Sequence, residues 1–373
     1  MNTTFELNNL RKDSDSFNGK FTQKSPVVEI FSAMVKGEEL SKYGKKADKA
    51  VAYIKELNSK AEMGDFSAIA EINTLRRFML EPVLMEEIKL LSVFGTYKPL
   101  GFDETVEREV YTHVGDKSRM QAANGDVVFP KIVKEKYQVP TFMVSGGYEV
   151  DYRRAALGDM SKENEGMEQV RIDIRNRAAL AVLTKVYNAI KNATGVKYMV
   201  EDNNLTKTNL DRVLTQIRRA GRPTFVGDYA LLSQVTPFAG YVGAINGNTI
   251  TGISEKMLNE INENGILGMY NGTVLKEMPN QYDYTSIVED EEGNKNFKTL
   301  LPEGLGFVIP TGAKSPIATW TRGGLTSFTG NDVKTGKIMT RFDLECAVDV
   351  AKGQEHQIGV ICDKNLVSED YNL

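Results

Sequence analysis

The sequence predicts an α+β fold, because helical and strand patterns occupy different parts of the chain. Apolar residues recur at helical spacing over residues 26–96 and again over residues 161–193. After residue 304 the apolar residues alternate with polar ones, as in strands. The 373 residues, 41% of them hydrophobic, are enough for a large core and two or three domains.

The N-terminal part is predicted to be an arm followed by short helices. We expect an arm over residues 1–25 and helices over residues 26–35, 45–60, 65–79 and 82–95. Asp65 can cap the third helix, and Pro82 fits the first turn of the fourth. Lysines crowd residues 36–60, which is typical of a solvated helical face and, as an alternative, of contact with an acidic partner.

Residues 97–148 form a charged, strand-rich excursion. A strand over residues 107–114 and a return strand over residues 127–133 flank a polar turn that ends in Asn124-Gly125, a strong hairpin signal. Pro130 places the return strand at an edge. Since the excursion has no apolar face broad enough for its own core, we expect it to rest on another copy of the chain; the alternative is a hairpin folded back on its own domain.

We expect inter-subunit contacts from five side chains of this excursion: Arg108, Tyr111, Lys117, Arg119 and Phe129. If the excursion is an assembly arm, deleting residues 103–138 should leave a soluble fold and abolish closed particles.

One very long amphipathic helix follows, over residues 161–193, about 50 Å long at 1.5 Å per residue. Asp159 or Ser161 can cap it, and Glu163 favours the positive end of its dipole. Gly166 is a weak point that could separate the first turn. Its buried stripe begins with Met167, Val170, Ile174, Ala178 and Ala181.

An α/β region and then long strands complete the chain. We expect a helix over residues 205–220, a strand and an Asp228-capped helix, a glycine-rich loop over residues 240–252, and an acidic hairpin tip at residues 289–294. The strand over residues 337–350 alternates, with Phe342, Leu344, Cys346 and Val348 on one face.

Composition and motifs argue against several classes of protein. The two histidines, His113 and His356, are 243 positions apart, and no spacing of cysteine and histidine suits zinc. Residues 330–337 have five residues between the glycines, where a phosphate loop has four. A net charge of −4 does not suit a nucleic-acid-coating protein, and no apolar run is long enough for a membrane span. We therefore expect no enzyme activity, cofactor, metal site or membrane contact.

The order of these parts resembles that of tailed-bacteriophage major capsid proteins, whose architecture is the Hong Kong 97-type shell fold shared with encapsulin compartments. Three strings resemble family segments: residues 82–91 before the extended loop, residues 147–154 returning into the long helix, and residues 265–275. The last string departs from the family pattern over residues 270–273, where proline is absent. The resemblance covers about residues 80–362.

The resemblance implies a domain plan. It assigns an N-terminal arm and helical region to residues 1–96, an extended β-hairpin loop to 97–147, a peripheral domain with the spine helix to 148–195 and 302–373, and an axial domain to 196–301. We expect residues 1–60 to remain in the shell, with any scaffold supplied as a separate protein.

The function implied is that of a major capsid protein in a bacteriophage virion, assembled in the host cytoplasm. Hexamers and pentamers of the chain would form an icosahedral shell around double-stranded DNA, held without sequence-specific contact, with scaffolding and portal proteins as partners. The alternatives are an encapsulin-like compartment that holds cargo protein, or another virion structural protein.

Overall fold

The structure of the 373-residue chain is a computed structural model. The structure describes residues 26–35, 40–88, 94–114, 120, 129, 131–151, 160–238, 241–245, 248–252, 259, 263, 265–289, 293, 295–311, 315–332 and 337–366.

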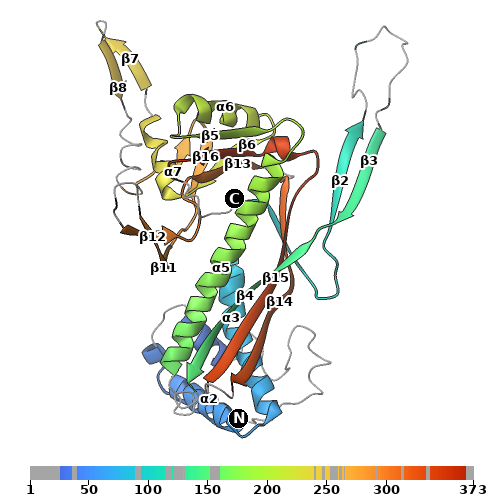
Figure 1. The fold of residues 1–373 in the computed structure, drawn as a ribbon, viewed down its shortest axis with the longest axis vertical. Coiled ribbons are helices and arrows are strands. Elements are labelled where there is room, and N and C mark those ends of the chain that lie inside the picture. The colour runs from blue at the N-terminus through green and yellow to red at the C-terminus, as the bar shows by residue number, and fades with distance from the viewer. Residues whose placement is uncertain are drawn as a thin grey trace.

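The spine helix α5 (Met160–Lys191) runs diagonally through the molecule and joins its two ends (Figure 1). It belongs to two hydrophobic cores. Its N-terminal half, from Met167 to Ala178, packs in the core at one end, and its C-terminal half, from Ala179 to Ile190, packs in the core of the other end. The long helix expected from the apolar stripe is thus confirmed, and Gly166 does not interrupt it.

The first core lies between the N-terminal helices, α5 and a four-stranded sheet. The helices are α1 (Pro26–Val35), the 3₁₀ helix η2 (Leu40–Tyr43), α2 (Lys45–Glu62) and α3 (Phe66–Ile88). The sheet has the order β1-β14-β15-β4, formed by β1 (Thr96–Leu100), β14 (Ile317–Asp332), β15 (Lys337–Val350) and β4 (Thr141–Asp151). Only β1 runs parallel to its neighbour. As expected, Phe342, Leu344 and Cys346 point into the core.

Pro82 lies inside α3, and the prediction of separate third and fourth helices was wrong. Asp65 does cap the helix, since its Oδ1 accepts a hydrogen bond from Ser67 N at 2.9 Å. Proline removes one helical hydrogen bond, a cost of about 3 kcal/mol. The helix continues because Phe78, Leu80 and Leu84, on either side of the proline, are almost fully buried in the same core.

The second end is built on a six-stranded mixed sheet with the order β5-β16-β13-β6-β10-β9. Its strands are β5 (Tyr198–Asp202), β16 (Gly359–Asp363), β13 (Leu305–Thr311), β6 (Arg222–Gly227), β10 (Thr273–Glu277) and β9 (Met269–Tyr270). The C-terminal half of α5 covers one face and α6 (Lys207–Ile217) the other. Burial on both faces explains the continuous apolar runs of β13 and β16.

The expected boundary between the axial domain (196–301) and the last part of the peripheral domain (302–373) would divide this sheet between two domains. Strands β13 and β16 come after residue 302, but they pair with β6 and β5, which come before it. Helix α7 (Tyr229–Ser233) follows β6 and is capped by Asp228, as expected. The remaining 3₁₀ helices are η4 (Thr236–Phe238) and η5 (Glu355–Gln357).

Three two-stranded ribbons leave these layers. They are β2 (Glu107–Val114) with β3 (Lys131–Gln138), β7 (Tyr241–Ile245) with β8 (Asn248–Gly252), and β11 (Tyr282–Glu289) with β12 (Lys295–Thr299). The third matches the expected acidic hairpin. The expected loop over residues 240–252 was wrong, since Ile245 pairs with Asn248. The dipeptide between them, Asn246-Gly247, is itself a strong hairpin signal.

Candidate inter-subunit contact site

The β2–β3 ribbon, here called the arm, extends away from both sheets (Figure 1). Its register runs from Glu107 opposite Gln138 to Val114 opposite Lys131. Almost every residue of β3 is exposed, so within the described chain the outer arm has no layer packed on it. A ribbon of two strands gains little stability in water by itself. The arm therefore needs either an internal anchor or an external partner.

Arg108 supplies the internal anchor at the base of the arm. Its guanidinium donates hydrogen bonds to the carbonyl oxygens of Asp349 (2.8 Å) and Pro316 (2.7 Å). It also lies 3.5 Å from the Asp349 carboxylate, which accepts a hydrogen bond from the Tyr137 hydroxyl at 2.6 Å. A small apolar cluster completes the base: Val106, Val139, Ala318, Trp320 and Ala347. The arm is thus fixed at its root to β14 and β15.

Electrostatics at the root reflect its burial. Burial lowers the pKa of the Arg108 guanidinium, although the Asp349 charge opposes the shift. Burial also raises the pKa of the Asp349 carboxyl, against the effects of the Tyr137 hydrogen bond and the Arg108 charge. Both side chains are largely buried and pair with each other, which favours one orientation of the arm.

Further out, one face of the arm carries a ladder of charged and aromatic side chains. Lys134 Nζ lies 2.8 Å from a Glu109 carboxylate oxygen and 5.8 Å from the centre of the Tyr111 ring. Lys136 forms an ion pair with Glu107. Exposed ion pairs of this kind contribute little to stability. They join the two strands of the arm in register and keep its surface soluble, but they do not fix the arm to the rest of the subunit.

The five side chains expected at the contact fall into three groups. Arg108 points inward to its own subunit, as described above. Tyr111 is exposed on the arm, and Phe129, two residues before β3, is 86% exposed. Lys117 and Arg119 lie outside the described residues. The sequence reasoning missed Ile132, an exposed apolar residue opposite His113 in the register, although the alternation of β3 could have identified it.

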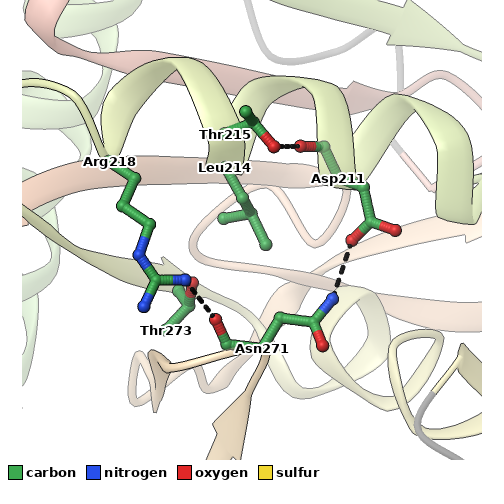
Figure 2. Close-up of a pocket in the computed structure, with 6 residues that line it drawn as sticks. All are labelled: Asp211, Leu214, Thr215, Arg218, Asn271 and Thr273. Atoms are coloured by element: carbon green, nitrogen blue, oxygen red, sulfur yellow. Dashed lines mark hydrogen bonds between the residues drawn. The ribbon is translucent and has the colours of Figure 1, made fainter.

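A separate, open pocket of about 450 Å³ lies between α6 and the β9–β10 turn (Figure 2). Arg218 donates to the carbonyl oxygen of Asn271 at 2.9 Å, and the Asn271 side chain donates to Asp211 at 3.1 Å. Asn271 and Gly272 both have positive φ, as in a tight two-residue turn. The polar groups of the pocket thus bind mainly to each other and stabilise the turn.

The described residues contain no group of three or more histidine, cysteine or acidic side chains that could hold a metal ion. Within the same part of the chain, no helix has the length and apolar character required to cross a membrane.

Comparison with known proteins identifies a family for this chain. Residues 6–362 match the model of a family described as "SPbeta prophage-derived putative capsid protein YonB". No curated protein matches the chain significantly.

Among solved structures, similar chains include the SrpI encapsulin of Synechococcus elongatus PCC 7942, with 12% identity, a TM-score of 0.44, and coverage of 75% of this chain and 89% of that chain. The virus-like particle of Pyrococcus furiosus has 10% identity, a TM-score of 0.42, and coverage of 75% and 96%. The mature capsid of bacteriophage PhiM1 has 14% identity, a TM-score of 0.41, and coverage of 73% and 86%.

The family match covers almost the whole chain and both of its cores. The α+β fold with an extended arm and a spine helix follows the Hong Kong 97-type plan that the resemblance implies, and the chain belongs to this family of phage-derived capsid proteins.

Proposed function

We propose that this capsid protein is the main building block of an icosahedral shell made of hexamers and pentamers, and that the arm of each subunit lies on a neighbour. The observation that carries the proposal is the family match over residues 6–362. The anchored root and exposed outer part of the arm support it, because a rigid base reduces the entropy lost when the outer part binds.

In this proposal Tyr111, Lys117, Arg119 and Phe129 contact the neighbouring subunit, while Arg108 aims the arm from its root. Repeated contacts between different surfaces of identical subunits close into rings when the rotation between them closes. Apolar burial and charge complementarity would drive this assembly without any catalytic group.

The finer parts of the proposal concern contents and partners. We propose that the shell encloses double-stranded DNA without sequence-specific contact, that a scaffolding protein and a portal protein assist its assembly, and that it forms in the host cytoplasm. The chain's net charge of −4 suits a shell that does not bind DNA tightly over its whole inner surface.

Negative-stain electron microscopy of the purified chain, with and without a candidate scaffold, tests the proposal. We expect closed shells, or sheets and tubes of hexamers. A discrete monomer or small oligomer under every condition would contradict it. Nuclease-protected DNA in particles taken from infected cells would distinguish a genome from a protein cargo.

A further inference from the structure

The β11–β12 ribbon carries an aromatic patch, defined as Tyr282, Tyr284, Ile287 and Phe297. Their side chains are 47%, 75%, 65% and 41% exposed, respectively. The rings of Tyr284 and Phe297 meet edge to face with centroids 5.2 Å apart. Clustered exposed aromatic residues mark interaction sites more often than scattered ones, because tyrosine and phenylalanine bury large areas at small entropic cost.

The base of this ribbon is pinned to the body of the subunit. The Asn280 side chain donates to Asp228 (2.8 Å) and to the Leu301 carbonyl (2.9 Å), and it accepts from Leu301 N (3.0 Å). Gln281 accepts a hydrogen bond from Arg175 of the spine helix at 3.1 Å. The patch is therefore held in position before any partner binds, which lowers the entropic cost of binding.

The arm and the aromatic patch lie on opposite flanks of the subunit. In Figure 1 the arm extends on one side of α5, and the β11–β12 ribbon lies on the other side. When copies stand side by side in the same orientation, the flank that carries the arm of one copy therefore turns towards the flank of the next copy that carries the patch. This is a head-to-tail contact between two different surfaces, the kind that repeats around a ring.

The two ribbons also complement each other in charge and polarity. Residues 107–138 of the arm contain six basic and five acidic side chains, and the basic excess lies on β3, which has three lysines and one glutamate. Residues 283–298 contain two basic and five acidic side chains. The outer arm offers the exposed apolar side chains of Tyr111, Phe129 and Ile132. Opposite charges around an apolar centre favour this pairing over contact between two like ribbons.

We propose that the aromatic patch of one subunit receives the outer arm of another copy of this chain. The inference rests on the proposed function and deepens it by naming the surface on which the arm lies. Phe297 and Tyr284 form the apolar centre of this contact, and Glu289, exposed at the end of β11, faces the lysines of β3.

Site-specific photo-crosslinking tests the contact directly. Phe297 is replaced by p-benzoyl-phenylalanine, a chain of normal isotopic composition is assembled with a ¹⁵N-labelled one, and crosslinked peptides are identified by mass spectrometry. We expect a mixed-isotope crosslink from position 297 to residues 107–138. The matched control carries the same photoreactive residue at Phe328, which is 59% exposed on β14, and should give no such crosslink.

A second variant measures the energetic contribution. Tyr284→Ser with Phe297→Ser should reduce the yield of assembled particles by about tenfold or more, as expected when a contact centre is lost. Phe328→Ser should leave the yield unchanged, and all variants should melt as the unassembled wild-type subunit does.

The outcomes separate this contact from the proposed function. Shells that form normally while position 297 crosslinks only outside residues 107–138 would overturn the contact and leave the capsid function intact. Wild-type chains that never form shells would count against the proposed function, and absence of the crosslink in their oligomers would overturn the contact as well.

Discussion

Gly166 shows how the absence of one side chain lets the spine helix approach the sheet. A Cβ atom at this position would lie 2.7 Å from Cγ of Tyr148 on β4. Tyr148 cannot easily move, because its ring stacks on Phe342 of β15 with centroids 6.2 Å apart. The glycine that the sequence marked as a weak point of the helix is therefore a packing requirement.

Gly166→Ala should destabilise the unassembled subunit by about 1–3 kcal/mol, because it overpacks this contact. This change in stability has the opposite sign to that of a glycine-to-alanine substitution at an exposed helical position, which stabilises a helix by about 1 kcal/mol. Urea denaturation measures the difference. The matched control is Gly330→Ala, where a Cβ meets nothing within 4 Å. Equal stability of the Gly166→Ala variant and the wild type would refute the packing explanation.

Arg76 and Glu163 form a buried ion pair between α3 and α5, with a distance of 2.5 Å and 5% of each side chain exposed. Arg76 also donates to Thr329 of β14 at 3.0 Å. Burial by itself would lower the pKa of Arg76, but the charge and hydrogen bond of Glu163 together with the influence of Tyr148 outweigh burial, and the pKa is raised. Glu163, expected from sequence to act on the helix dipole, thus joins three elements of the first core.

Arg76→Met should cost about 3–5 kcal/mol, since it leaves a carboxylate buried without its partner. The double variant Arg76→Met, Glu163→Met should recover much of that loss, because it removes both charges. Equilibrium unfolding of the single and double variants gives the coupling. If the stability losses of Arg76→Met and Glu163→Met added up to the loss of the double variant, the two side chains would not be coupled.

Both cysteines are free and buried. Burial raises the pKa of the Cys346 thiol to about 12 and that of the Cys362 thiol to about 11. Because the thiolate is the reactive form, the native protein should react with iodoacetamide far more slowly at pH 8.5 than the unfolded chain does. Mass spectrometry of the alkylated peptides checks this. Rapid native-state labelling of either cysteine would contradict the burial of that strand.

Above pH 8.5 the same shifts should reduce the stability of the subunit. The unfolded chain loses thiol protons at its ordinary pKa while the folded chain keeps them, so the stabilisation present below about pH 8.5 declines as the pH rises towards 11. A Cys346→Ala, Cys362→Ala variant should show a smaller decline over this range in urea titrations.

At the scale of elements, β14 contains a bulge that bends the four-stranded sheet. The register shifts between Arg322 and Leu325, and the two residues between them, Gly323 and Gly324, have φ of +73° and +70°. Glu81 of α3 accepts a hydrogen bond from Leu325 N at 3.3 Å. Burial raises the pKa of this carboxyl, with Arg77 and the Leu325 N–H opposing the shift. The bulge thus lets β14 form a hydrogen bond with α3 at the point where its pairing with β15 is interrupted.

Gly324→Ala should destabilise the subunit by about 1–3 kcal/mol, because alanine strains a positive φ and its Cβ would lie 2.6 Å from a Glu81 carboxylate oxygen. Gly330→Ala in the same strand again serves as the control. Thermal unfolding monitored by circular dichroism measures both. A Gly324→Ala variant as stable as that control would show that the bulge tolerates a side chain.

The elements also show what sequence reasoning could and could not predict. The spine helix, the Asp65 and Asp228 caps and the alternating strand β15 follow from local patterns, and all four are present. The failures depend on distant contacts. Pro82 remains helical because both of its neighbouring turns are buried, and the inward orientation of Arg108 depends on carbonyl groups more than 200 residues away. Periodicity contains no information about such partners.

At the scale of the whole molecule, the subunit has two kinds of surface. The apolar surfaces of the helices and sheets around α5 are buried in the subunit's own cores. The exposed side chains of the arm and of the aromatic patch remain uncovered in a single copy. A protein of a capsid family is expected to cover such surfaces by assembly. Changes to the uncovered surfaces should therefore impair assembly without unfolding the subunit. Variants of the arm test this expectation most directly.

Complete deletion of residues 103–138 would remove Val106 and the Arg108 anchor and uncover Trp320, so it would alter folding as well as assembly. A cleaner variant replaces residues 112–133 with Asn-Gly and joins Tyr111 to Lys134, which face each other in the register.

We expect this variant to keep the melting temperature of the unassembled subunit, because the root contacts persist, but to form no closed shells in electron micrographs. The full deletion, as its counterpart, should melt earlier. Closed shells from the shortened arm would show that the outer arm is dispensable, and the contacts that close the shell would then have to lie on the two cores.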